Sequence, residues 1–320
     1  MREFVVPDGT GGASRTTLSL VLGSGGARGY AHIGVIEELL AHGFDIRSIA
    51  GSSMGALVGG VFAAGKLDAY RDWVLPLQRL DVLRLLDWTF TGGGFIKGDR
   101  IIGALRKHIG DIDIEDLPIS FTAVAVDLDA QREVWFSRGS LFDAIRASIA
   151  IPTIFRPHHL QGRLLVDGGL LNPLPVSPTL RDITDATIAV DVNGPAEPLG
   201  RESATPAEDP SRRARADANA PTRRIRRLFG SLLERRERAA VARDPGLLEL
   251  FGRSLDVVQE TITRLKLAAQ PPDLLITIPR NICMFYDFHR AEEAIAFGRQ
   301  RTREALARWT PMHGRAPSHS

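Results

Sequence analysis

Cysteine, export signals and long apolar runs are scarce or missing in this sequence. The single cysteine, Cys283, cannot form an internal disulfide or a cysteine metal site, which fits a reducing compartment. The longest apolar stretch, residues 56–64, is far shorter than the ~20 residues that a membrane-spanning helix needs, and residues 1–17 lack the pattern of a secretory signal. We therefore expect a cytoplasmic protein without signal peptide or transmembrane helix, peripheral at most to the inner face of the membrane.

Neither sign of charge is in large excess. The 40 basic and 38 acidic residues leave a net charge of +2, so the total charge gives no reason to expect a nucleic acid partner. The eight histidines show no spacing typical of metal ligands. We accordingly expect no metal and no cofactor.

Strand and helix patterns alternate along most of the chain. Apolar, β-branched runs predict strands, and three-to-four spacing of apolar residues predicts helices. The predicted strands are 17–22, 46–50, 119–128, 132–137, 163–166, 187–192 and 274–278, and the predicted helices include 30–42, 141–150 and 247–265. Such alternation implies an α/β fold with a mostly parallel sheet covered on both faces.

The amino-acid composition changes between residues 195 and 245, and we interpret this segment as an arginine-rich, disordered insertion or linker. Residues 211–243 hold eleven arginines against three acids, a local charge of +8. Each cation near an anionic membrane contributes ~1 kcal/mol, so this segment could make peripheral membrane contact, or it could be a solvated linker. The remaining organisation that we predict is a leader 1–16, a core 17–194, its C-terminal part 246–300 and a tail 301–320.

A glycine-framed serine occurs at residues 51–55 (GSSMG), between a predicted strand and a predicted helix. A very tight turn needs glycine at Gly51 and Gly55, because side chains there would collide with neighbouring elements. Such a turn would raise the Ser53 hydroxyl to the edge of the sheet and point a helix N-terminus at it. Ser53 is thus a candidate nucleophile, with a chance glycine-serine turn as the alternative.

A glycine-rich loop at residues 23–29 (GSGGARG) also follows a strand. Its backbone amides, at Gly25 and Gly26 above all, could surround a phosphate or the oxyanion of a tetrahedral intermediate. A dinucleotide site would need a glycine where Arg28 stands, and an acid at the end of the second strand, which Asp45 precedes. The nucleotide alternative is therefore the weaker one.

A third motif, Asp167-Gly168-Gly169, follows the predicted strand 163–166. An aspartate at a strand end can present its carboxylate to the tip of a neighbouring strand. Turn-capping aspartates are common, so this motif alone does not identify a site.

Together and in this order, the three motifs resemble the patatin-like phospholipases, a family that includes plant storage acyl hydrolases and relatives of neuropathy target esterase. The resemblance covers about 18–191 and 247–298, and further family-like segments are 146–152 with Phe155, 172–175 and 272–273. It implies a three-layer α/β/α sandwich with a mostly parallel central sheet. It also implies a lipid ester substrate, a Ser53–Asp167 catalytic dyad without histidine, and an oxyanion hole at Gly25, Gly26 and Arg28.

By that resemblance Asp167 accepts the proton of Ser53 as the hydroxyl attacks an ester and returns it to the leaving alcohol. A free aspartate, with a pKa of about 3.9, is a poor base at neutral pH, so the loop amides would supply much of the acceleration. Arg28 would either anchor the loop or sit near a lipid phosphate.

Several alternatives remain open from the sequence. The catalytic group could be a Ser-His-Asp triad, although His32 in the first helix suits a structural role. The acyl-enzyme could serve an acyltransferase, and a nucleotide-binding regulatory module is the rival from a different class. Trp88, Phe90 and Phe95 could form an acyl pocket or an interfacial contact with lipid, or they could pack in the core.

Overall fold

A computed structural model describes residues 15–85, 94–198 and 246–309 of the chain. The chain divides into two units, residues 1–197 with 255–320, and residues 198–254. Residues 199–245, most of the segment that we interpret as an insertion, lie outside the described residues. The sheet and the candidate site belong to the first unit, and so do the helices that cover the sheet, apart from residues 247–254 at the start of one of them.

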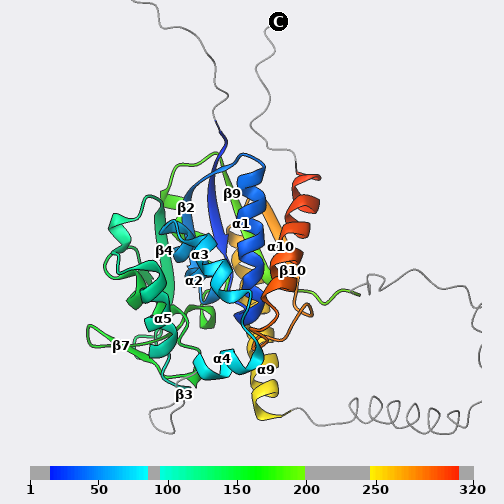
Figure 1. The fold of residues 1–320 in the computed structure, drawn as a ribbon. Coiled ribbons are helices and arrows are strands. Elements are labelled where there is room, and N and C mark those ends of the chain that lie inside the picture. Colours follow the sequence, from blue (N-terminus) through cyan, green and yellow to red (C-terminus); the bar gives the residue numbers. More distant parts are fainter. Residues whose placement is uncertain (1–14, 86–93, 199–245, 310–320) are drawn as a thin grey trace, which may run out of the picture. The chain divides into compact units, whose positions relative to one another are not determined.

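The central sheet is mostly parallel, as Figure 1 shows. Its parallel strands are, in spatial order, β10 (Leu274–Pro279), β9 (Ala186–Gly194), β1 (Thr17–Leu22), β2 (Asp45–Ser52) and β4 (Ser120–Asp127). Antiparallel strands complete it, namely β5 (Arg132–Phe136), β8 (Arg163–Asp167) and β7 (His158–Leu160). A separate parallel pair joins β3 (Gly94–Ile96) to β6 (Thr153–Phe155).

Helices cover both faces of this sheet. The helices are α1 (Ala31–Ala41), α2 (Met54–Ala63), α3 (Leu67–Val74), α4 (Arg79–Leu85), α5 (Asp99–Ile109), α6 (Leu141–Ser148), α9 (Leu247–Ala269) and α10 (Ala291–Leu306). Short 3-10 turns are η1 (Gly26–Tyr30), η2 (Ile114–Asp116), η3 (Gly168–Leu170) and η4 (Ser177–Arg181).

The alternation of side chains along β1 explains the two layers. Leu20 joins the large core cluster, to which α1, α2, α6 and α10 contribute buried side chains, and α1 and α10 lie side by side (Figure 1). Val21 points to the opposite face, where it packs with Leu174 and with Leu267 of α9. Because apolar residues occupy both faces, the strands are buried on both sides, and the predicted α/β/α fold class is confirmed.

The predicted elements agree closely with the observed ones where both exist. β1 coincides with the predicted strand 17–22, and the other predicted strands differ from the observed bounds by one or two residues. The sequence-based prediction did not include α3, α4, α5 or α10. Helix α10 continues past residue 300 to Leu306, and Thr302 within it is fully buried.

The ends of β2 and β8 meet on one edge of β4. β2 runs parallel to β4 and ends with Ser52 opposite Val124. β8 runs antiparallel and ends with Asp167 opposite Ala125, the next residue of β4. β5 occupies the other edge along the same stretch of β4, so β2 and β8 approach each other end to end. This topology places Asp167 beside the turn that follows β2.

Candidate active site

Ser53 occupies the tight turn between β2 and α2. Its backbone has φ 53° and ψ −121°, a conformation that non-glycine residues rarely adopt and that neighbouring structure must enforce. A Cβ atom at Gly55 would lie 2.1 Å from the carbonyl oxygen of Leu22, and one at Gly51 would lie 2.5 Å from the Gly55 backbone. The chain can therefore make this turn only with glycine at both positions.

Ser148, at the end of α6, fixes the backbone of this turn through hydrogen bonds. The backbone amide of Ser53 donates a hydrogen bond to Ser148 Oγ at 2.9 Å, and that hydroxyl donates to the carbonyl oxygen of Val124 at 2.6 Å. Ser148 is fully buried. We did not assign a role to Ser148 from the sequence, although a hydroxyl in an otherwise apolar helix end is the kind of signal that could have found it.

Asp167 accepts hydrogen bonds through both carboxylate oxygens. Ser53 Oγ donates to Oδ2 at 2.6 Å, and the Gly169 amide donates to Oδ1 at 2.7 Å. A Cβ atom at Gly168 would lie 2.1 Å from the Val124 carbonyl oxygen, so only glycine fits directly after the aspartate. The sequence-predicted pair is thus in hydrogen-bond contact in the structure.

Burial changes the acidity of Asp167. The side chain is almost fully enclosed, and burial raises the pKa of the carboxyl to about 7, against the opposing effect of the hydrogen bonds from Ser53 and Gly169. The low basicity that we expected from a free aspartate therefore does not apply at this position. A base with a pKa near neutrality is well matched to proton transfer at neutral pH.

No histidine takes part in this pair within the described part of the chain. His32 Nε2 lies 2.8 Å from the Gly23 carbonyl oxygen, and burial lowers the pKa of His32 to about 4. The ring is therefore neutral near pH 7, and Nε2 carries the proton that it donates to Gly23. His32 supports the start of the glycine loop rather than contacting Ser53 or Asp167.

The glycine loop packs tightly beside Ser53. Gly26 has φ +57°, and a Cβ there would lie 2.3 Å from the carbonyl oxygen of Phe285. Among the described residues, the backbone amides of Gly25 and Gly26 have no hydrogen-bond acceptor. Gly26 and Ser53 line one pocket, so the free Gly26 amide and the Ser53 hydroxyl belong to the same site, and Gly25 directly precedes Gly26.

The Arg28 side chain turns away from this pocket. It is buried, its Nη2 forms an ion pair with Asp256 Oδ1 at 2.7 Å, and its Nε donates to the Gly25 carbonyl oxygen at 3.2 Å. Of the two roles considered for Arg28, these contacts correspond to anchoring the loop. Asp256 was not among the residues that we predicted for the site.

The pocket at Ser53 is apolar and has about 750 Å³ of empty space, part of it open to solvent. Its wall comes from the glycine loop, from helices α2 to α5 and from the chain around residues 149–155. Lining side chains are Tyr30, Met54, Leu57, Tyr70, Trp73, Leu77, Val82, Ile101, Leu105, Ile149, Ile151, Phe155 and Phe288. Trp88, Phe90 and the side chain of Phe95, our candidates for an acyl pocket, lie outside the described residues.

None of the described helices combines the length and apolar character that crossing a bilayer requires. Within residues 15–85, 94–198 and 246–309 we find no cluster of three or more histidine, cysteine or acidic side chains that could hold a metal ion.

Comparison with known proteins places these features in a family. A family model described as patatin-like phospholipase matches residues 20–180. A Mycobacterium tuberculosis protein named as an uncharacterized NTE family protein is 43% identical over 340 aligned positions, which cover 92% of each chain. Neuropathy target esterase sws of Drosophila persimilis is 32% identical over 166 residues, which are 50% of this chain and 12% of that protein.

Among solved structures, VipD of Legionella pneumophila has a TM-score of 0.42 and 13% identity, over 92% of this chain and 67% of that one. The residues matched by the family model contain the glycine loop, the Ser53 turn and Asp167. The chain belongs to the patatin-like phospholipase family, whose general activity is the hydrolysis of lipid esters.

Proposed function

We propose that this protein is a serine esterase of the phospholipase A or lysophospholipase type, with Ser53 as nucleophile and Asp167 as general base. The observation that carries the proposal is the 2.6 Å contact from Ser53 Oγ to the buried Asp167 carboxylate, at the wall of an apolar pocket. A strained serine, a base with a pKa near 7 and free amides in one place are the groups that acyl transfer requires.

The reaction proceeds in two halves. Ser53 Oγ attacks the ester carbonyl while its proton passes to Asp167, and the amides of Gly25 and Gly26 stabilise the oxyanion that forms. The tetrahedral intermediate collapses, and Asp167 returns the proton to the leaving alcohol. Water then attacks the acyl-enzyme carbonyl while Asp167 accepts its proton. As the bond between Ser53 Oγ and the acyl carbon breaks, Asp167 gives this proton to Oγ, and the free acid leaves. The N-terminus of α2, which begins directly after Ser53, adds favourable potential for the negative charge.

The pocket supports a lipid as the substrate. Among the described residues no charged side chain lines it, and an acyl chain inside would gain about 0.8 kcal/mol for each buried methylene group. A single acyl chain beside Ser53 would leave the alcohol part of the ester toward the open side.

The acyltransferase alternative has no support in the comparisons, and it predicts that an added alcohol acceptor competes with water for the acyl-enzyme. The nucleotide-binding alternative predicts a thermal shift with a dinucleotide and no ester hydrolysis. Hydrolysis of p-nitrophenyl esters, lysophospholipids, phospholipids and neutral glycerides by the purified protein tests the proposal. Absence of hydrolysis across this panel would refute it.

Narrowing the pocket should shorten the acyl chains that the enzyme accepts. Ile101, at the start of α5, lines the pocket and is only partly buried, so tryptophan can replace it without disrupting the core. Losing room for two methylene groups costs ~1.6 kcal/mol, so Ile101→Trp should lower kcat/KM about tenfold for C12–C16 esters and less than twofold for a C4 ester.

The matched control is Leu180→Trp, which adds the same side chain at an exposed position outside the pocket lining. It should leave kcat/KM unchanged at every chain length. Equal losses on short and long esters in Ile101→Trp would show that the pocket does not hold the acyl chain.

We also propose that residues 211–243, which lie outside the described residues, make peripheral contact with anionic membrane. Their charge of +8 is the support for this. Replacing the eleven arginines with glutamine should abolish sedimentation with vesicles that contain anionic lipid, whereas 0.5 M salt should weaken binding of the unaltered protein. Vesicles of neutral lipid are the control. Unchanged binding after the replacement would end this proposal.

A further inference from the structure

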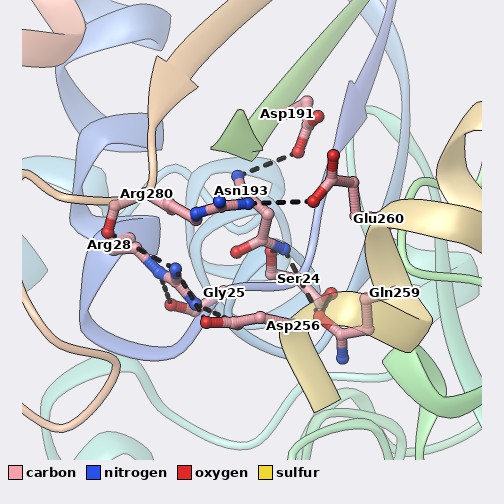
Figure 2. Close-up of polar contacts among 9 residues, drawn as sticks. All are labelled: Ser24, Gly25, Arg28, Asp191, Asn193, Asp256, Gln259, Glu260 and Arg280. Carbon is pink, nitrogen blue, oxygen red and sulfur yellow. Dashed lines mark hydrogen bonds and ion pairs between the residues drawn. The ribbon is translucent and has the colours of Figure 1, made fainter. Parts of the chain in front are cut away.

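Successive carbonyl oxygens of the glycine loop are held by side chains from outside the oxyanion site. Three carbonyls in a row each accept one hydrogen bond. The pairs are His32 Nε2 with Gly23 at 2.8 Å, Asn193 Nδ2 with Ser24 at 2.8 Å, and Arg28 Nε with Gly25 at 3.2 Å. Figure 2 shows the second and third of these contacts. A side-chain hydrogen bond thus fixes the orientation of each of these three consecutive carbonyl groups.

Fixing a carbonyl also fixes the amide of the same peptide group. A trans peptide is planar, and its N–H points opposite to its C=O. Because the Ser24 carbonyl points toward Asn193, the Gly25 N–H points away from Asn193. Because the Gly25 carbonyl points toward the Arg28 guanidinium, the Gly26 N–H points away from that guanidinium. Neither amide has an acceptor among the described residues. Both N–H groups are therefore free to donate a hydrogen bond to a ligand.

Helix α9 supports both of the side chains that hold these two peptide groups. Asp256 binds the Arg28 guanidinium, with Nη2 to Oδ1 at 2.7 Å. Gln259 Oε1 accepts from Asn193 Nδ2 at 3.3 Å and from Ser24 Oγ at 3.0 Å. Positions 256 and 259 are three residues apart and so lie on one face of the helix, which Figure 2 shows turned toward the loop.

The arrangement leaves the Asn193 amide little freedom. Its Nδ2 faces two acceptors, the Ser24 carbonyl and Gln259 Oε1, so a flipped amide would place oxygen against oxygen. Asn193 and Gln259 are both about 5% exposed, so water cannot replace the lost contacts. Asn193 Oδ1 is buried and has no hydrogen-bond partner among the described residues, so the two contacts of Nδ2 set the orientation of this amide.

We propose that Arg28 and Asn193, supported by Asp256 and Gln259 of α9, are positioning residues that orient the Gly25 and Gly26 amides toward the oxyanion. The proposal rests on the esterase function above and adds residues that the three sequence motifs do not contain, apart from Arg28. These side chains act through the loop and do not contact the reacting atoms. Their removal should weaken binding of the tetrahedral state more than binding of the substrate.

Two substitutions test the two supports separately. Asn193→Leu keeps a similar size and removes the donor to Ser24. Because losing an oxyanion donor costs ~10²–10³ in rate, and here the amide remains but is less well oriented, kcat should fall about 10–100-fold. Asp256→Asn keeps the shape of the partner of Arg28 but removes its charge, and kcat should fall about 3–10-fold. KM for a C4 p-nitrophenyl ester should stay within twofold in both.

The control is Glu260→Gln, on the same helix one residue after Gln259. Glu260 pairs with Arg280 at the surface, at 2.9 Å, as Figure 2 shows, and in the described part of the chain it forms no hydrogen bond or ion pair with the glycine loop. This variant should keep the kcat of the unaltered protein.

A trifluoromethyl ketone distinguishes positioning from a general structural effect. Ser53 adds to this ketone to give a hemiketal oxyanion, so its inhibition constant should rise by the same factor by which kcat/KM falls. Activity is divided by the number of sites that a fluorophosphonate labels, which removes any contribution of unfolded protein. Asp256→Asn, at a partly exposed helix position, serves if Asn193→Leu does not fold.

An unchanged inhibition constant, or full activity for each labelled site in Asn193→Leu and Asp256→Asn, would overturn the proposal while leaving the esterase function intact. If the unaltered protein neither hydrolyses esters nor takes the label, the esterase function itself is refuted, and this inference with it.

Discussion

Replacing Ser53 by alanine is expected to lower kcat for ester hydrolysis by about 10⁴-fold or more, because no other hydroxyl contacts the Asp167 carboxylate in the described part of the chain. The remaining loop amides can still stabilise an oxyanion, so slow hydrolysis by water above the uncatalysed rate is compatible with the account. Steady-state hydrolysis of a C4 p-nitrophenyl ester measures the effect.

The neighbouring serine supplies a matched control. Ser52 is fully buried, and its hydroxyl has no hydrogen-bond partner among the described residues. Ser52→Ala removes a hydroxyl group one residue before Ser53, and kcat should stay within twofold of that of the unaltered protein. Activity near the unaltered level in Ser53→Ala would mean that the nucleophile has been misassigned, and a large loss in Ser52→Ala would point to the turn itself rather than the Ser53 hydroxyl.

Asp167→Asn is the second substitution with a large expected effect. An amide can accept a hydrogen bond from Ser53 but cannot take its proton, so kcat should fall about 10³–10⁴-fold. In the unaltered protein kcat/KM should rise with pH and level off above an inflection near 7, because only the ionised carboxylate acts as base. The inflection should disappear in the variant. Retained activity, or an inflection unchanged by the substitution, would remove Asp167 from the mechanism.

The same burial predicts an effect on stability. Folding raises the pKa of Asp167 from its ordinary 3.8 to about 7, so the folded protein binds a proton that the unfolded chain releases between these values. The contribution of Asp167 to stability is therefore greatest below pH 4 and falls as the pH rises to 7, by at most about 4 kcal/mol at 1.36 kcal/mol for each pH unit.

The Asp167→Asn variant has no carboxyl at this position, so it does not lose this contribution to stability as the pH rises. The free energy of unfolding of the variant minus that of the unaltered protein should increase between pH 4 and 7 and stay constant above pH 7. Denaturant titrations at pH 4.5 and pH 8 measure the difference. An equal difference at the two pH values would show that the carboxyl is not buried in solution.

Local features of the site could be predicted from the sequence because they depend on short-range constraints. The tight turn at Ser53 needs glycine on both sides, and a β-branched run followed by glycine indicates β1 and its loop. The resemblance of the three motifs to the patatin-like phospholipases then implied that Ser53 and Asp167 work together. The two residues meet because β2 and β8 pair with β4 and end at adjacent residues of it. A local sequence pattern does not predict which strands pair.

Long-range features could not be predicted in the same way. The basicity of Asp167 depends on burial by residues distant in sequence, so the value for a free aspartate was misleading. Asn193 lies at the end of β9 and Gln259 within α9, and their contacts with Ser24 follow from tertiary packing alone. The wall of the apolar pocket at Ser53 likewise comes in part from helices α3 to α5, which the sequence pattern did not predict.

Covalent labelling by a fluorophosphonate tests the central claim most directly. The reagent reacts with activated serine hydroxyls, and mass spectrometry of the digested protein identifies the modified residue. We expect one adduct, on Ser53, which forms faster as the pH rises through 7 and is slowed by Asp167→Asn. An adduct on another residue, or no adduct on folded protein, would contradict the account.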